Sequence, residues 1–382
     1  MSGTGSDILI VGIGGAAIGF ATRAAALAPG ARLACFDSDG ASEEAAQQSF
    51  FLMGAARCNG RGCGGDAVKA RAAAIDDIAA VRDAVSGTRL AIVAVALGGG
   101  FGSGAAPEIL KALRDEGITA ICVATTPFAF EGGDRAAAAR RALPLLESAA
   151  TATAVISLDD LFAGGGDAPL ADAYAAASGT MSDVLTLFWR LAAKPGFITI
   201  GAERIAAIAS SSSGKMRIAT AHATGEGRAT AAANALLASR LTGREVRLEN
   251  AEAAIVGVLA GSDLRLAELT EISTALSARL SPTCHLDFGV ILDEEAHDAL
   301  SIVCLLFEKG GAAEADDVVG GEPAKAQGTT SERSGRSRRA KSCDPLASSS
   351  SGARFKGTEG TIYNGQNLDI PTYQRRNLPL EK

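Results

Sequence analysis

The chain has few of the residues that build metal centres or disulfide frameworks. Its 382 residues include three histidines and seven cysteines, and no two cysteines are spaced as C-x-x-C. An odd number of scattered thiols indicates neither a zinc site nor a set of disulfides. Most of these thiols are therefore expected to be small buried apolar groups.

Long apolar runs are missing as well. Hydrophobic residues make up 47% of the chain, but no window approaches the roughly 18 consecutive apolar residues that a membrane helix needs. The N-terminal sequence MSGTGSDILIVGIGG has no cationic segment before its apolar run, which argues against a secretory signal peptide. These absences predict a cytoplasmic protein without direct membrane insertion.

Basic residues are outnumbered by acidic ones over most of the chain. The formal net charge is −7, and the residues before Lys309 alone carry −10. A negatively charged surface repels the phosphates of nucleic acids, so nucleic acid is not an expected partner.

Short apolar runs alternate with alanine-rich helical stretches in the first half of the chain. Strands are expected at Ile8 to Val11 and within the sequences ARLACFDSD, RLAIVAVA, TAICVATTP and ATAVIS. This alternation predicts a doubly wound parallel α/β sheet. The apolar spacing that follows Pro169 predicts one long helix.

The remaining organisation follows from changes in composition. We assign 1–168 to a first α/β domain, 169–194 to a central helix and 195–307 to a second α/β domain. Its four well separated strands are expected within MRIATAHATG, AAIVGVLAG, CHLDFGVIL and ALSIVCLLF. Residues 308–364 are rich in Gly, Ala, Ser and Arg. They are expected to form a flexible linker, because they cannot bury enough apolar surface to offset their ordering entropy. Residues 365–382 form a short amphipathic segment at the end of a disordered tail.

Two glycine-rich turns follow predicted strands. The first holds Gly12, Gly14 and Gly15, and the second runs from Gly98 to Gly104. Glycine lets the backbone approach a phosphate, and the N-terminus of the next helix offers free N–H donors. Two such turns at neighbouring strand ends favour a triphosphate site.

The first turn by itself has an alternative interpretation. Its G-x-G-x-x-A pattern also fits a dinucleotide-binding fingerprint, with Asp37 as the acid that contacts the ribose. The chain would then be an NAD(P)-dependent oxidoreductase, although the second glycine turn would have no explanation.

Several motifs together resemble one known family. GGGFGSGAAPEI resembles the tubulin-superfamily signature GGGTGSG, and in particular that of bacterial FtsZ, the filament-forming GTPase of cell division. GRGCGGDA is similar to the FtsZ loop that senses the terminal phosphate, and TTPFAFEGGDR parallels its K-P-F-x-F-E-G-x-x-R segment. The second domain and the peptide LDIPTYQRR also resemble FtsZ. The resemblance implies a tubulin/FtsZ-like fold, GTP/GDP binding and assembly into filaments at the division septum, alone or with a conventional FtsZ.

The resemblance also implies which residues contact the nucleotide. Glu131 and Arg135 match residues that hold the ribose, Asp39 matches an acid near the phosphates, and Tyr174 matches an aromatic that stacks on the base. The full expected nucleotide-binding set is Gly12, Gly14, Gly15, Asp39, Gly62, Gly64, Gly98, Gly99, Gly100, Gly102, Ser103, Gly104, Glu131, Arg135, Tyr174 and Ser178.

Some positions in this set or beside it in the sequence depart from the family. Phe101 replaces a threonine whose hydroxyl can reach the phosphates, and either packs against its surroundings or partly fills the phosphate pocket. Ile18 and Gly19 replace a glycine and an asparagine in the first turn. Ser178 stands where the family has the aspartate that reads guanine, and serine lacks paired acceptors. These changes predict weakened binding and uncertain base specificity.

The largest departure follows the long helix. FtsZ carries N-x-D-x-x-D in the loop that enters the next subunit's active site, and this chain has Thr199, Gly201 and Arg204 there. Two carboxylates that orient water and cations are lost. The resemblance therefore implies impaired or lost hydrolysis, with no confident catalytic residue. Glu203, in the same loop, is the alternative for a functional GTPase with altered water positioning, and the need for Mg²⁺ stays open.

The C-terminal peptide combines apolar and basic residues. This pattern suits docking of a short segment into a partner groove, although a simple disordered end is the alternative. The resemblance implies a membrane-tethering division protein as the partner. The residues expected to bind it are Leu368, Asp369, Ile370, Pro371, Tyr373, Arg375 and Arg376.

Overall fold

The computed structural model describes most of the first 308 residues of the chain. The described ranges are 7–46, 49–161, 169–239, 250–294, 296–308, 362–363 and 366–367. The chain divides into two compact units, Met1–Ala315 and Asp316–Lys382. Within the described helices, none is long and apolar enough to cross a bilayer.

The first half of the larger unit is a parallel sheet in the order β3-β2-β1-β4-β5-β6. Its central strands are almost completely buried, as expected where helices cover both faces of a sheet. The predicted doubly wound sheet is confirmed; β3 was not predicted. The strands are β1 (Ile8–Ile13), β2 (Arg32–Asp37), β3 (Phe50–Leu52), β4 (Leu90–Ala96), β5 (Thr119–Thr126) and β6 (Ala152–Ser157).

Four more strands extend the same sheet to ten strands. They are the four predicted for the second domain, and β10 pairs antiparallel with both β7 and β8, while β9 pairs parallel with β8. The two halves join where β6 and β7 pair over only Thr153↔Lys215 and Ala154↔Met216. These strands are β7 (Lys215–Thr224), β8 (Ala251–Ala260), β9 (His285–Leu292) and β10 (Ala299–Glu308).

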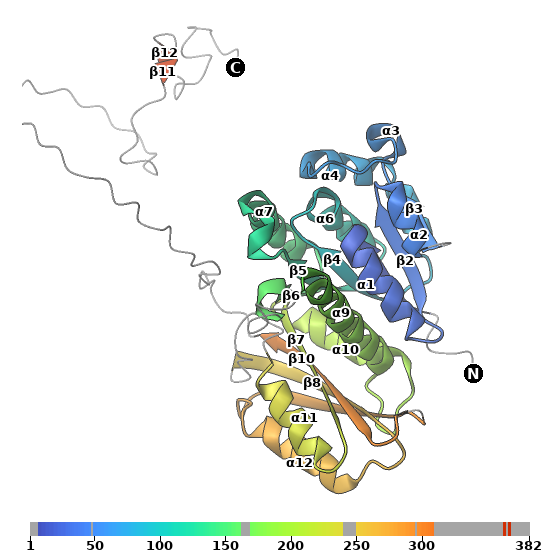
Figure 1. Cartoon of the computed structure of the whole chain (residues 1–382), viewed down its shortest axis with the longest axis vertical. Helices are drawn as coiled ribbons and strands as arrows, with labels where there is room; N and C mark the ends of the chain where they lie inside the picture. Colours follow the sequence, from blue (N-terminus) through green and yellow to red (C-terminus); the bar gives the residue numbers. More distant parts are fainter. Residues whose placement is uncertain are drawn as a thin grey trace, which may run out of the picture. The chain divides into compact units, whose positions relative to one another are not determined.

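Helices form layers on the two faces of this sheet (Figure 1). One face carries α1 (Gly15–Ala26), the predicted long helix α9 (Leu170–Ala193) and α10 (Gly201–Ser211). The buried side chains of this layer, including Phe188 and Trp189, form one apolar cluster with strands from both halves. The opposite face of the first half carries α4 (Ala67–Asp76), α5 (Ile78–Ala84), α6 (Gly100–Asp115) and α7 (Gly133–Ala149), and the second half carries α11 (Arg228–Leu237) and α12 (Leu266–Ser277). The short helices are α2 (Glu43–Ala46), α3 (Ala55–Cys58), α8 (Leu158–Leu161), η1 (Gly40–Ser42) and η3 (Ala129–Glu131).

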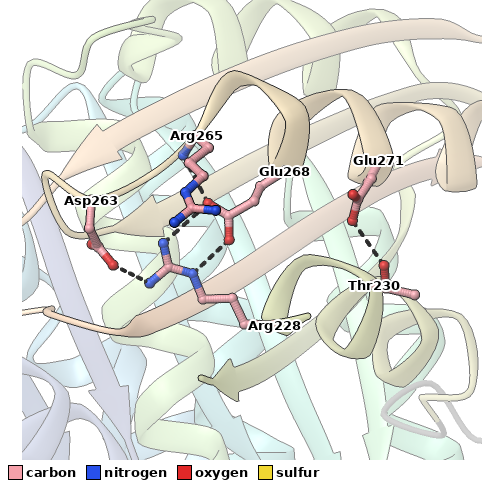
Figure 2. A network of polar contacts seen from close by, with 6 residues as sticks. All are labelled: Arg228, Thr230, Asp263, Arg265, Glu268 and Glu271. Carbon is pink, nitrogen blue, oxygen red and sulfur yellow. Dashed lines mark hydrogen bonds and ion pairs between the residues drawn. The ribbon is translucent and has the colours of Figure 1, made fainter. Parts of the chain in front are cut away.

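A buried arginine ties α11 to α12 (Figure 2). Arg228 begins α11, and its side chain is only 4% exposed. Its guanidinium donates to Asp263 Oδ2 at 2.7 Å and to both carboxylate oxygens of Glu268 at 2.8 and 3.2 Å. The hydrogen bond from Arg228 lowers the pKa of Glu268 and the same bond raises the pKa of Arg228. The buried positive charge of Arg228 is therefore paired with the carboxylates of Asp263 and Glu268.

The smaller unit contains β11 (Ile362–Tyr363) and β12 (Gln366–Asn367), which pair antiparallel. This pair departs from the sequence analysis, which placed 362–363 in a flexible linker. The sequence between the two strands is Asn-Gly, the dipeptide that most favours a two-residue hairpin turn. The predicted partner-binding peptide from Leu368 to Arg376 lies outside the described residues.

Candidate nucleotide site

The two glycine turns meet at the carboxyl edge of the sheet. β1 and β4 are neighbours, and the chain continues from β1 to β2 on one side and from β4 to β5 on the other. Doubly wound sheets bind ligands at such a switch point. A Cβ atom at Gly14 would lie 3.3 Å from the backbone nitrogen of Gly102, so the turns touch. The structure thus brings together the two predicted phosphate turns.

The helices that follow these turns begin without side-chain caps. Gly14 (φ 86°) precedes α1 and Gly99 precedes α6, and neither helix has a capping side chain that accepts a hydrogen bond. The N–H of Gly14 donates to Phe36 O at 3.0 Å. The N–H of Gly98 donates to Ser103 Oγ at 2.9 Å, which fixes the second turn. The backbone N–H groups in the first helical turn of α1 and of α6, together with the positive dipole ends of both helices, therefore suit an anion.

Close backbone packing explains one glycine of the second turn. A Cβ at Gly102 would lie 2.1 Å from the carbonyl oxygen of Ala96, whereas a Cβ at Gly19 on α1 would meet no atom within 4 Å. Gly102→Ala is expected to destabilise the fold by on the order of 2 kcal/mol through overpacking. Gly19→Ala, the matched control, should stabilise it by about 0.5–1 kcal/mol. Thermal unfolding measures both changes, and equal shifts for the two variants would contradict this assignment.

Gly12 and Ile18, at the first glycine turn, determine how α1 packs against the protein. Gly12 lies inside β1, and a Cβ there would lie 3.0 Å from both Ala21 Cβ and Ile18 Cα. Ile18 itself is fully buried in a small apolar cluster with Cys35 and Ala46. Gly12 therefore admits the helix against the strand, and the side chain of Ile18 is directed into the protein.

Phe101 is also a packing residue. It is the second residue of α6, is 5% exposed and belongs to the apolar cluster that includes Cys63 and Ala70. The structure favours the interpretation in which the phenyl ring packs against its surroundings over the one in which it fills the phosphate pocket.

A third loop reaches the same edge. Gly62 (φ 73°) and Gly64 (φ 62°) both have left-handed backbones, and the N–H of Gly62 donates to Ser38 O at 3.0 Å. A Cβ at Gly100 would lie 3.0 Å from the carbonyl carbon of Gly65, which places this loop against the start of α6. Asp39, across from Gly62, accepts a hydrogen bond from the N–H of Ala41 at 3.0 Å.

Asp37 belongs to this site, although the sequence analysis considered it only for a dinucleotide. It is 5% exposed, and its carboxylate accepts hydrogen bonds from Ser38 N at 2.7 Å and Ser42 Oγ at 2.9 Å. A Cβ at Gly15 would lie 3.6 Å from its Oδ2. Burial raises the pKa of Asp37, against the lowering effect of these hydrogen bonds. Its position at the end of a buried strand beside the switch point was the available signal.

The predicted ribose ligands lie beside the second turn. A Cβ at Gly98 would lie 3.3 Å from Arg135 Cβ. Arg135 donates to Glu131 Oε2 at 2.6 Å, and Glu131 Oε1 accepts the N–H of Phe128 at 3.0 Å. The two charged residues are therefore held together at this edge.

An aromatic cluster adjoins Glu131 and Arg135, the predicted ribose ligands. The Tyr174 ring lies edge-on to Phe128 and Phe130, with centroids 5.2 and 6.5 Å away. Burial raises the pKa of Tyr174, and the nearby charge of Glu131 raises it further. Phe130 is 62% and Tyr174 42% exposed, so aromatic surface remains free for stacking in this chain. Ser178 follows one turn later on α9. Phe128 and Phe130 were missed as single site residues, although their motif was recognised.

The segment with Thr199, Gly201 and Arg204, predicted as a loop, lies at the opposite edge, and the last two of these residues belong to the start of α10. Glu203 accepts a hydrogen bond at 2.6 Å from Arg89, which immediately precedes β4 and so marks the amino edge. Arg204 donates from Nε and Nη2 to the two carboxylate oxygens of Asp287 on β9, at 2.7 and 3.3 Å. The structure therefore does not bring Thr199, Gly201, Glu203 and Arg204 together with the glycine turns of the same chain.

No cluster of three or more His, Cys, Asp or Glu side chains that could hold a metal ion occurs in the part of the chain that the structure describes. The site is thus built from backbone N–H groups, one Glu–Arg pair, buried Asp37 and aromatic rings.

Comparisons with known proteins agree with this geometry. Residues 8–164 match the model of the Tubulin/FtsZ family, GTPase domain, and residues 214–307 match that of the FtsZ family, C-terminal domain. FtsZ 1 of Rhizobium meliloti is 31% identical over 256 residues, which span 67% of this chain but 43% of that protein. FtsZ 2 of the same organism is 31% identical over 242 residues, 63% of this chain and 69% of that protein.

Solved structures give the same result. An FtsZ mutant from M. jannaschii has a TM-score of 0.75 and 25% identity, covering 80% of this chain and 92% of that one. CetZ2 from Haloferax volcanii, a GTPγS-bound protofilament, has a TM-score of 0.64 and 22% identity, covering 78% and 92%. The filament-forming interpretation predicted these matches, whereas the interpretation as an NAD(P)-dependent oxidoreductase did not. From its two family domains, their order and the glycine turns that meet at the switch point, the chain belongs to the FtsZ family.

Proposed function

We propose that this chain is a filament subunit of the cell-division cytoskeleton that binds guanine nucleotide weakly and hydrolyses GTP poorly or not at all. The support is its family membership, the names of its relatives as cell division proteins, and the chemistry of its two sheet edges. It acts in the cytoplasm at the division septum.

The residues at the carboxyl edge fit a nucleoside triphosphate. The uncapped starts of α1 and α6 and the loop with Gly62 and Gly64 would hold the phosphates. Glu131 and Arg135 would hold the ribose, and Tyr174 would stack on the base. Binding is weakened because Phe101 offers no hydroxyl and Ser178 no carboxylate.

The position of the segment from Thr199 to Arg204 supports a head-to-tail assembly of subunits. Its residues lie at the amino edge of the sheet and the glycine turns at the carboxyl edge, so the loop reaches glycine turns only in a neighbouring copy. Such a heterologous contact generates open filaments. CetZ2, a protein of the same fold, was solved as a GTPγS-bound protofilament.

The substitution of Gly201 and Arg204 for acids is the observation that carries the proposal. Hydrolysis needs groups that orient the attacking water and the associated cations. Glycine supplies no side chain, and Arg204 is engaged by Asp287 through two hydrogen bonds. A guanidinium is always protonated and therefore cannot accept a proton from water. The charge of Arg204 is in addition paired with Asp287.

The test is GTP binding and turnover of the purified chain, alone and mixed with a conventional FtsZ. We expect turnover by the chain alone to be lower than that of the conventional protein by about tenfold or more. In mixed filaments, turnover should fall with the fraction of this chain, because each copy contributes a defective loop. Sustained GTP turnover by the chain alone would contradict the proposal. Loss of that turnover in Glu203→Ala would then show that Glu203 positions the attacking water. Bound NAD(P) would support the oxidoreductase alternative.

The C-terminal peptide is proposed to dock on a membrane-tethering division protein. Deleting Leu368 to Lys382 is expected to abolish localisation to the division plane while filament assembly in vitro stays intact. Fluorescence microscopy and sedimentation measure the two effects. A scrambled peptide of equal composition is the control, and a scrambled tail that localises normally would contradict sequence-specific docking.

A further inference from the structure

We propose that Cys58 and Cys63 are a redox-active pair that forms a reversible intramolecular disulfide across the loop between α3 and α4, which packs against the start of α6. A low-molecular-weight disulfide such as oxidised glutathione is the oxidant. The formation of the disulfide is inferred from the geometry of the two cysteines. Its effect on nucleotide binding rests on the proposed function.

The two sulfur atoms are already neighbours. Cys58 Sγ lies 3.4 Å from Cys63 Sγ, and the residues are 3% and 7% exposed. A disulfide needs the two sulfur atoms at about 2.05 Å. Each sulfur atom therefore has to move by less than about 1 Å towards the other. The cysteines therefore need only a local change to join.

The backbone between and beyond the cysteines allows that change. Cys58 ends the four-residue helix α3, and Asn59, Gly60 and Gly62 have φ values of 51, 67 and 73°. After Cys63 come Gly64 and Gly65, both with positive φ. The buried Cys35 and Cys122 differ, because they lie in β2 and β5, where neighbouring strands fix the backbone on both sides.

The chemistry is thiol–disulfide exchange in two steps. The thiolate of one cysteine attacks a sulfur of oxidised glutathione, a mixed disulfide forms and one glutathione thiolate leaves. The second cysteine thiolate attacks the protein sulfur of this mixed disulfide and releases the second glutathione. The protein loses two electrons and two protons, and one disulfide is reduced to two thiols.

Burial makes the closed loop slow to react. It raises the pKa of the Cys63 thiol to about 11, against a lowering hydrogen bond from Ser38, whose Oγ lies 3.1 Å from the sulfur. At pH 7 the thiolate fraction is small, so exchange requires the loop to open. Any ligand that holds the loop closed will therefore protect the pair.

Oxidation acts on the candidate phosphate loop. The N–H of Gly62, the residue before Cys63, donates to Ser38 O, and Gly65 packs against the start of α6. Drawing the sulfurs together shifts this segment and removes the thiol partner of Ser38. If the proposed function holds, the oxidised chain binds GTP about tenfold more weakly, and bound GTP slows oxidation.

The experiment uses the reduced full-length chain with oxidised glutathione at pH 8, followed by alkylation, trypsin digestion and mass spectrometry. Arg57, Arg61 and Lys69 are cleavage sites, so the disulfide joins peptide 58–61 to peptide 62–69. We expect this linked pair from the native chain. Cys58→Ser and Cys63→Ser should each abolish it and leave the remaining cysteine as a mixed disulfide with glutathione, while Cys122→Ser leaves it unchanged.

The proposal is overturned if the half-exposed Cys284 becomes glutathionylated while no linked pair forms, or if the pair forms only in denaturant. The wild-type digest decides this even where a variant fails to fold. Repeating the reaction with GTP separates the two proposals. A linked pair in a chain that binds no GTP contradicts the proposed function alone, whereas GTP that binds without slowing the reaction contradicts the coupling.

Discussion

The double substitution Gly201→Asp/Arg204→Asp is expected to raise the steady-state GTP turnover of this chain by about tenfold or more. It replaces a missing side chain and a cation by two carboxylates at the edge that faces the next subunit in the proposed filament. It also removes the partner of Asp287, which Arg204 now holds through two hydrogen bonds. Phosphate release from the assembled protein is the measurement.

The matched control is Gly201→Ala/Arg204→Ala, which removes the cation without adding acids. Gly201 has φ 74°, so a side chain there costs on the order of 1 kcal/mol in both variants. The alanine variant should stay close to the parent chain. An equal gain in both variants would mean that Arg204 inhibits turnover by its charge, and that carboxylates are not what the loop lacks.

Arg228→Met is expected to lower the free energy of unfolding by about 3 kcal/mol, because it leaves partly buried Glu268 without its buried partner. Chemical denaturation measures the loss. Thr230→Val is the control, since it removes an exposed hydrogen bond to Glu271 nearby (Figure 2) and should cost less than about 0.5 kcal/mol. Losses of similar size in both variants would contradict a special role for the buried arginine.

The same network predicts a pH dependence. Arg228 lowers the pKa of Glu268 below its ordinary value of 4.5, so this stabilisation is fully present above pH 4.5 and is lost as the pH falls through the lowered value. The difference in stability between the parent chain and Arg228→Met should therefore shrink on acidification. A difference that stays constant from pH 7 to the acid limit of folding would contradict the ion pair as its source.

Sequence patterns predicted the elements better than their contacts. Apolar runs predicted nine of the ten strands in the main sheet. In the parallel half the reason is that buried parallel strands are continuous and hydrophobic. The three-residue β3 is too short and too exposed to produce such a run. The pairing of β6 with β7 that joins both halves involves two residue pairs and leaves no trace in hydrophobicity.

The site was predicted where spacing determines geometry. Glycines after β1 and β4 had to meet because adjacent parallel strands end at one edge. Gly12 and Gly14 could not be separated into a packing role and a loop role, since that depends on how closely α1 approaches β1. The pairing of Arg204 with Asp287 and the contact of Cys58 with Cys63 depend on side-chain positions that spacing does not give.

The most direct test is the fate of GTP in the assembled chain. The protein is polymerised with GTP labelled at the terminal phosphate, collected by sedimentation and assayed for bound nucleotide and released phosphate. We expect filaments that retain GTP, with phosphate release close to that of buffer. Filaments that fill with GDP and release phosphate steadily, with Gly201 and Arg204 unchanged, would contradict it.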